Sequence, residues 1–138
     1  MGFFNKLKGK VKKIENKNLL EAVVAGCVWA SAADGTIDDS EIAKMMEVIE
    51  CNPGLKHFGP EIGKTVSEMS KAFSASIQVG RTQAMRKIRT VVGNDQDCED
   101  VVAAILSVVA ADGKIGTEEE KVVQAIAKEL RVDLNQFA

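Results

Sequence analysis

The 138-residue sequence contains no tyrosine, one tryptophan, one histidine and two prolines. It also lacks any run approaching the roughly 18 apolar residues that a membrane-spanning helix needs, and its start has no signal-peptide core. Few aromatic residues and little alternation of β-branched residues argue against a sheet and favour helices. With 46% hydrophobic and 28% charged residues, the composition is that of an ordinary globular domain.

The cysteines are too few and too scattered for a disulfide framework or a zinc site. Cys27, Cys51 and Cys98 are odd in number and form no CxxC pair. The sequence also lacks a glycine-rich phosphate loop, a nucleophile elbow and a recognisable Cys–His pair. We therefore expect reduced thiols in a cytoplasmic protein that is not an enzyme and needs no organic cofactor.

Charge is distributed unevenly along the chain. Residues 1–18 hold six lysines against one glutamate, whereas the other 120 residues hold 12 basic and 19 acidic side chains. Apolar residues at helical spacing predict a basic amphipathic helix over 1–18. Its lysines would face an anionic inner-membrane surface or a membrane-side partner, unless the apolar side packs on the body and the lysines only face water. These lysines are Lys6, Lys8, Lys10, Lys12 and Lys13.

Helical periodicity continues through residues 19–138. Apolar stretches at 19–33 and 101–111 are typical of buried helices, and amphipathic stretches separate them. Asn52-Pro53-Gly54 and Gly59-Pro60-Glu61 have the composition of a helix end and a helix start. We predict an all-α fold of about seven helices in one compact bundle, and a monomer.

Two segments 78 residues apart nearly repeat each other: AADGTIDDSE at 32–41 and AADGKIGTEE at 110–119. The similarity extends into the apolar stretches that precede them. Each copy predicts an apolar helix, an acidic turn and an amphipathic helix. We expect two duplicated helix–turn–helix units that bury their apolar faces against each other.

The repeated turns can be explained as helix corners alone. Gly35 and Gly113 suit the left-handed conformation that ends a helix. Isoleucines two residues later would fill the corners, and acids in the next helix's first turn suit its dipole. The paired positions are Ile37 with Ile115, and the capping-box pairs Asp38 with Glu41 and Thr117 with Glu120.

A role as helix corners does not explain one feature of the repeat. Both copies keep an aspartate and a glutamate seven residues apart. If the units pack about a pseudo-twofold axis, four carboxylates approach each other, and each pair repels by about 1–4 kcal/mol. Such a cluster needs a proton, an arginine or a hard divalent cation such as Ca²⁺ or Mg²⁺. An acidic docking patch for a basic partner is the third interpretation. The candidate residues are Asp34, Glu41, Asp112 and Glu119, with Asp38 beside them.

Together, these features resemble the tellurite-resistance TerB family. The resemblance covers the Phe-Phe basic start at residues 2–6, both Asp-Gly turns with their acids, and the closing segment 133–137. It implies an all-helical domain in a bacterial tellurium-ion resistance and stress-response system. It also implies association with a TerC-like integral membrane protein and with TerD-like proteins.

Carried onto this chain, the family's suspected acidic site falls on Asp34, Glu41, Asp112 and Glu119. The second turn departs from the first, because Gly116 and Thr117 stand where the first has Asp38 and Asp39. A shared site would therefore be asymmetric.

A second basic cluster lies at 81–89, without aromatic residues between its charges. We interpret it as a solvated helix face and expect no nucleic-acid partner. The sequence thus predicts a non-enzymatic binding protein with an acidic, cation-binding surface. The alternative is a metal-free interaction scaffold whose acids serve as helix caps and docking charge.

Overall fold

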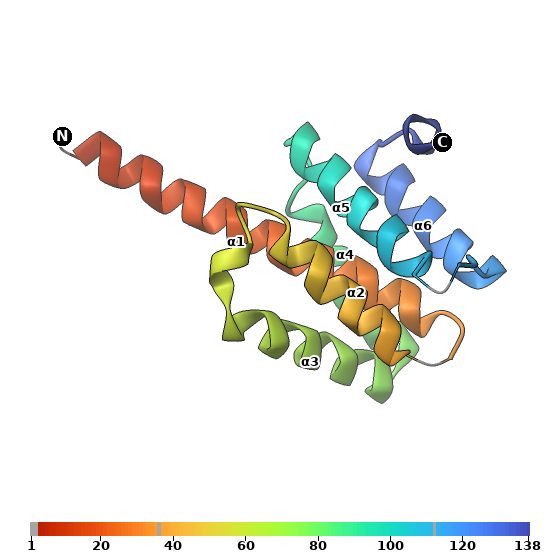
Figure 1. Cartoon of the computed structure of the whole chain (residues 1–138). Coiled ribbons are helices and arrows are strands. Elements are labelled where there is room, and N and C mark those ends of the chain that lie inside the picture. Colours follow the sequence, from red (N-terminus) through yellow and green to blue (C-terminus); the bar gives the residue numbers. More distant parts are fainter. Residues whose placement is uncertain (1–2, 36, 112) are drawn as a thin grey trace.

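The chain folds into a bundle of helices (Figure 1). The computed structural model describes the backbone of residues 3–35, 37–111 and 113–138 and, within these ranges, the side chains from Asn16 onward. This part of the chain contains six α-helices, two 3₁₀-helices and no strand, which confirms the all-α prediction. The α-helices are α1 (Phe3–Ala32), α2 (Asp39–Glu50), α3 (Pro60–Ala75), α4 (Ile77–Arg89), α5 (Asp95–Val109) and α6 (Thr117–Leu130), and the 3₁₀-helices are η1 (Lys56–Phe58) and η2 (Leu134–Phe137).

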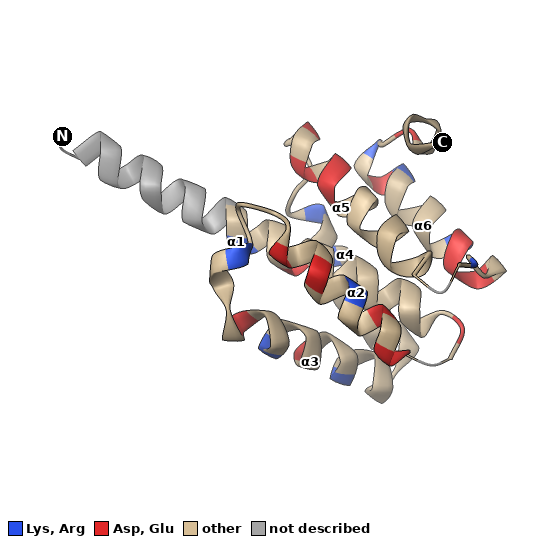
Figure 2. Cartoon of the chain, in the orientation of Figure 1, with Lys and Arg blue, Asp and Glu red and all other residues tan. Residues whose placement is uncertain are grey.

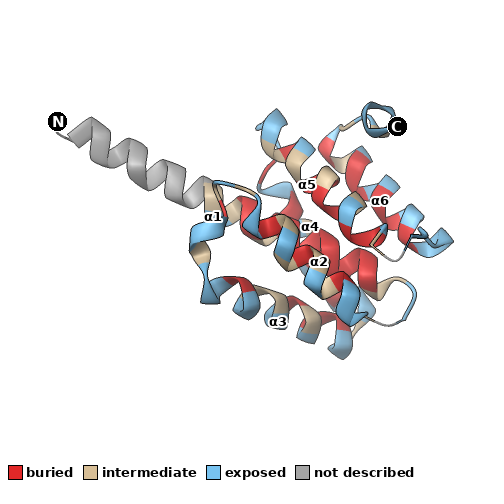
Figure 3. Cartoon of the chain, viewed as in Figure 1, coloured by how far each residue is buried: buried red, intermediate tan, exposed pale blue. Residues whose placement is uncertain are grey.

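Helix α1 is the central element of the bundle. It contacts each of the other five α-helices. Its half from Leu19 onward carries almost no charge (Figure 2) and is almost wholly buried (Figure 3). This apolar segment is the helix around which the others pack, because an apolar surface on all sides can be covered only by neighbours on all sides.

The prediction of about seven helices was too high for the described residues. The basic segment and the apolar segment were expected as two helices, but α1 runs through residue 18 without interruption. Residues 10–25 contain neither glycine nor proline, so nothing in the local sequence ends the helix there. The two predicted helices are one.

Side-chain caps and special backbone residues separate the remaining helices. Ser76 is the cap between α3 and α4, and its Oγ accepts a hydrogen bond of 3.3 Å from the Val79 amide. Asn94 begins α5 in the same way, accepting from the Asp97 amide at 3.1 Å. Pro60 occupies the first turn of α3, where its missing N–H leaves no bond unmade.

The two repeated segments occupy equivalent places in the chain. The first joins α1 to α2 and the second joins α5 to α6, and both connections lie at the same end of the bundle (Figure 1). Their glycines share a left-handed conformation, with φ of 97° at Gly35 and 86° at Gly113. The bundle thereby positions both acidic turns on one side of the molecule.

No helix in the described part of the chain combines the length and the apolar character needed to cross a bilayer.

Candidate functional site

The centre of the candidate site is a pair of glutamates, one from each repeated segment. Glu41 on α2 and Glu119 on α6 are each only 5% exposed. Together with Ser31 they are the buried polar or charged residues of the described structure. Carboxylates are seldom buried to this extent unless they are paired or hydrogen-bonded, so both positions need an explanation.

Glu41 is held by the end of α1. Ser31 Oγ donates a hydrogen bond of 3.0 Å to Glu41 Oε2. The pKa of Glu41 is nevertheless raised above its usual range, first by burial and then by the negative charges of Glu119, Asp34 and Asp38. The Ser31 hydrogen bond opposes this rise because it favours the ionised carboxylate.

The charge of Glu119 therefore acts directly on Glu41, although the two residues are 78 positions apart. Glu119 has a structural partner of its own, since its Oε1 accepts a hydrogen bond of 3.1 Å from the Gly116 amide. This bond satisfies one of the free amides at the start of α6. The two turns thus meet through the first turns of the helices that follow them.

The remaining predicted residues lie around this pair in different ways. Asp34 and Asp38 are exposed, and Asp38 caps α2 by accepting a hydrogen bond of 3.0 Å from the Ser40 amide. Asp112 lies outside the described residues. Among the described side chains, no three His, Cys, Asp or Glu residues form a group that could hold a metal ion.

Two details of the corners differ from the prediction. Asp38 was expected to form a capping box with Glu41, but the Glu41 carboxylate turns inward to Ser31. In the second copy the cap is Gly116, not Thr117, and the acid that bonds back to it is Glu119, not Glu120. The cap stays at the position equivalent to Asp38, but glycine has no side chain to accept from an amide, so the side-chain bond at this helix start comes from Glu119.

The corner isoleucines also differ from each other. Ile37 packs against the core as expected. Ile115, in contrast, is 44% exposed and lines a surface groove with Leu134 and Phe137. Its expected role as a corner plug is wrong, because the side chain is partly open to solvent at this groove and does not fill the core.

Ser31 is a site residue that sequence reasoning missed. A signal was present, since Ser31 and Glu21 are the polar residues of the apolar stretch 19–33. The second copy has Val109 at the equivalent place, so the hydrogen bond exists in one copy only. Aligning the two repeated segments draws attention only to residues that both copies share, and Ser31 is not one of them.

The lysines of the basic segment lie in the part of α1 whose side chains fall outside the described residues. They are Lys6, Lys8, Lys10, Lys12 and Lys13.

Comparison with known proteins agrees with the resemblance seen in the sequence. The family model described as tellurite resistance protein TerB matches residues 20–138. The chain belongs to the TerB family. Membership indicates a role related to tellurite resistance. The search of curated proteins found no significant match, and neither did the search of solved structures.

Proposed function

We propose that this TerB-family protein is a non-enzymatic binding component of a tellurium-ion resistance and stress-response system, and that its two acidic turns together hold a divalent cation, Ca²⁺ or Mg²⁺. The observation that carries the proposal is the pairing of Glu41 with Glu119. Two carboxylates from distant turns are almost excluded from water and repel each other. A cation between them would offset both the burial and the repulsion.

The chemistry of the donor set fits a hard cation. Glu41 and Glu119 offer only carboxylate oxygens, which are the ligands that Ca²⁺ and Mg²⁺ prefer, but among the described side chains no third acid joins them in a metal-binding group. Ser31 and the Gly116 amide each bond one glutamate oxygen. Each of these bonds orients one glutamate carboxylate, and a carboxylate has about four acceptor positions in all. Asp112 would add a further carboxylate from the second turn.

A specific observation favours the alternative of a metal-free scaffold. Asp38 caps α2, Glu119 accepts from the amide of the α6 cap residue Gly116, and Glu41 joins α2 to α1, so each of these acids has a structural role without a cation. In that case the exposed acids of the turns would provide docking charge for a basic partner.

An amide NMR titration of the metal-free protein with CaCl₂ and then MgCl₂ separates the two functions. A shared cation site predicts saturable shifts in both 34–41 and 113–119. At a cation concentration of 100 times Kd, the free energy of unfolding should rise by about 2.7 kcal/mol. Shifts in one turn alone would contradict a shared site. No saturable shift at millimolar cation would support the scaffold.

Matched variants assign the effect to the paired acids. Glu41→Gln with Glu119→Gln removes both charges and keeps oxygens that can accept from Ser31 and Gly116. We expect the double variant to lose the stabilisation by cation, as Asp34→Asn with Asp112→Asn should. Glu61→Gln, an exposed acid in the first turn of α3, is the control and should respond to cation like the wild type.

The proposal has a second part, which concerns the basic segment. Its lysines would contact the inner-membrane surface or a membrane-side partner such as a TerC-like protein, with TerD-like proteins as further candidates. Co-sedimentation with vesicles of phosphatidylethanolamine and phosphatidylglycerol tests the lipid contact. Binding should weaken with salt and with glutamine at the lysines Lys6, Lys8, Lys10, Lys12 and Lys13. Equal binding to vesicles without phosphatidylglycerol would contradict it.

A further inference from the structure

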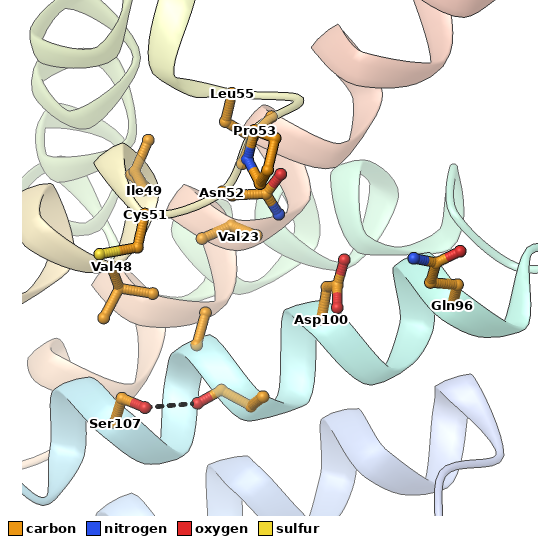
Figure 4. Close-up of a pocket in the computed structure, with 12 residues that line it drawn as sticks. Val23, Val48, Ile49, Cys51, Asn52, Pro53, Leu55, Gln96, Asp100 and Ser107 are labelled. Atoms are coloured by element: carbon orange, nitrogen blue, oxygen red, sulfur yellow. Dashed lines mark hydrogen bonds between the residues drawn. The ribbon is translucent and has the colours of Figure 1, made fainter.

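A cavity of about 400 Å³ lies on the body of the protein, between the end of α2, the turn that follows it and one face of α5. We call it the α2–α5 cavity (Figure 4). Its α5 wall is formed by residues at helical spacing, with the small side chains of Ala103 and Ala104 at its centre. Buried apolar side chains line the opposite side, among them Val23, Ile49 and Leu55. The cavity exists because two alanines face α2 where larger side chains would fill the space.

The cavity is lined by one acidic side chain. Asp100 on α5 is half-buried and lies across from Asn52 (Figure 4). The Asn52 side chain is held at its oxygen, because Oδ1 accepts a hydrogen bond of 2.9 Å from the Gly54 amide. Asn52 also lowers the pKa of the Asp100 carboxyl, against the effect of burial. Gln96, one helical turn before Asp100, adds a second amide to this rim. The Ser107 hydroxyl at the other end donates to the Ala103 carbonyl at 2.9 Å.

The electrostatic surroundings of Asp100 favour a cation. Burial raises the pKa of its carboxyl most, and the charges of Asp97 and Glu99 raise it further. Among the described residues, the charged groups that act most on Asp100 are thus acids rather than lysines or arginines. A cation bound beside this half-buried carboxylate would offset both the burial and the repulsion by its acidic neighbours.

We propose that the α2–α5 cavity binds a small organic cation, a short-chain primary alkylammonium, with its charged head on Asp100 and its alkyl chain on the apolar lining. The polar rim and the apolar lining lie side by side, which is the arrangement expected for an amphipathic ligand. A bare metal ion fits less well, because one carboxylate and two amides give it few ligands and leave the apolar lining unused. This site is separate from the acidic turns, so it stands whether or not they bind a cation.

The test is an amide NMR titration of the full chain with butylammonium chloride, with sodium chloride and 1-butanol as the matched probes for charge and for alkyl chain. We expect saturable butylammonium shifts at residues 51–55, 96–107 and 23, and no saturation with either control. Shifts that follow ionic strength alone would overturn the proposal. Binding of 1-butanol as tight as that of butylammonium would also overturn it, because the carboxylate would then contribute nothing.

Two variants with one control assign the binding to Asp100 and to the cavity. Asp100→Asn keeps the size of the side chain and should weaken butylammonium binding at least tenfold. Glu99→Gln removes the same charge from the next, exposed position and should change the Kd less than twofold. Ala103→Leu fills the cavity without altering any charge and should abolish the shifts, which keeps the test decisive if Asp100→Asn folds poorly. Equal losses for Glu99→Gln and Asp100→Asn would show a diffuse attraction to acidic surface and would overturn the site.

Discussion

Ser31 Oγ donates a hydrogen bond of 3.0 Å to Glu41 Oε2, and both residues are buried. The bond joins the last turn of α1 to the first turn of α2 across the Asp-Gly corner. It is also the interaction that favours the ionised form of Glu41 against burial and three neighbouring acids. The first acidic turn is therefore held in place by a residue that lies before the repeated motif.

Replacing Ser31 by alanine should destabilise the protein. The buried Glu41 carboxylate would lose a hydrogen bond with no water to replace it, which costs about 1–3 kcal/mol. Urea unfolding measures the loss. Ser107→Ala is the matched control, because that hydroxyl is exposed and bonds to its own helix, and its effect should stay within about 0.5 kcal/mol. Equal effects of the two variants would contradict the structural role of Ser31.

Replacing a glycine by alanine should change the stability of the protein in opposite directions at Gly63 in α3 and at Gly80 in α4. At Gly80 an added Cβ would lie 2.5 Å from the Phe73 ring and 2.9 Å from its Cα, so α3 and α4 would have to separate. We expect Gly80→Ala to cost about 1–3 kcal/mol. Gly63 lies within α3 with no such contact within 4 Å, so Gly63→Ala should stabilise the helix by about 0.5–1 kcal/mol. Thermal unfolding compares the two, and a stabilising Gly80→Ala would show that the helices pack less closely there.

The charge of Asp100 should make stability depend on pH. Its folded pKa is raised above the ordinary 3.8, so the folded protein binds this proton more tightly than the unfolded chain. The contribution of Asp100 to the free energy of unfolding therefore falls as pH rises from 3.8 through the folded pKa. Asp100→Asn should be more stable than wild type above that window and similar below it.

Urea unfolding at a series of pH values measures this difference. Glu50→Gln, which neutralises an exposed carboxyl at the end of α2, should keep the wild-type profile. A constant difference between Asp100→Asn and wild type across the whole range would show that the substitution acts through packing and not through charge.

The three thiols should differ in reactivity. Cys51 is exposed, whereas Cys27 and Cys98 are buried and their pKa values are raised, both by burial first. Because the thiolate is the reactive form, we expect a disulfide reagent such as DTNB to modify about one thiol per native chain and all three after denaturation. Mass spectrometry of the native adduct should identify Cys51. Rapid labelling of Cys27 would mean that α1 is not buried as described.

Sequence motifs were sufficient to predict those parts of the fold whose conformation depends only on neighbouring residues. Gly35 and Gly113 adopt the left-handed conformation that the Asp-Gly motif predicts, and Asp133 caps the final 3₁₀-helix with its own side chain. The glycines need no tertiary contact for this, since only they adopt positive φ without steric cost. Periodicity also indicated the all-α class, because a stripe of apolar residues at helical spacing is a property of the segment itself.

The candidate site was predictable only in part. The motif spacing selected Glu41 and Glu119 but could not show that both are buried or that one acts on the other. That depends on α2 and α6 presenting their first turns to the same end of the bundle. Ser31 and the cap at Gly116 were missed for the same reason, since each depends on where a side chain points after the helices have packed.

The amino-acid sequence by itself determined the helices, the glycines that end two of them and the family to which the chain belongs. These features depend on local conformational preference and on residue patterns along the chain. Only the tertiary structure decided which acids lie buried and that Asp100 faces Asn52 across a cavity. The burial of a side chain, the repulsion between two acids and the shape of a cavity depend on contacts between segments far apart in the sequence. They are therefore fixed only when the helices pack.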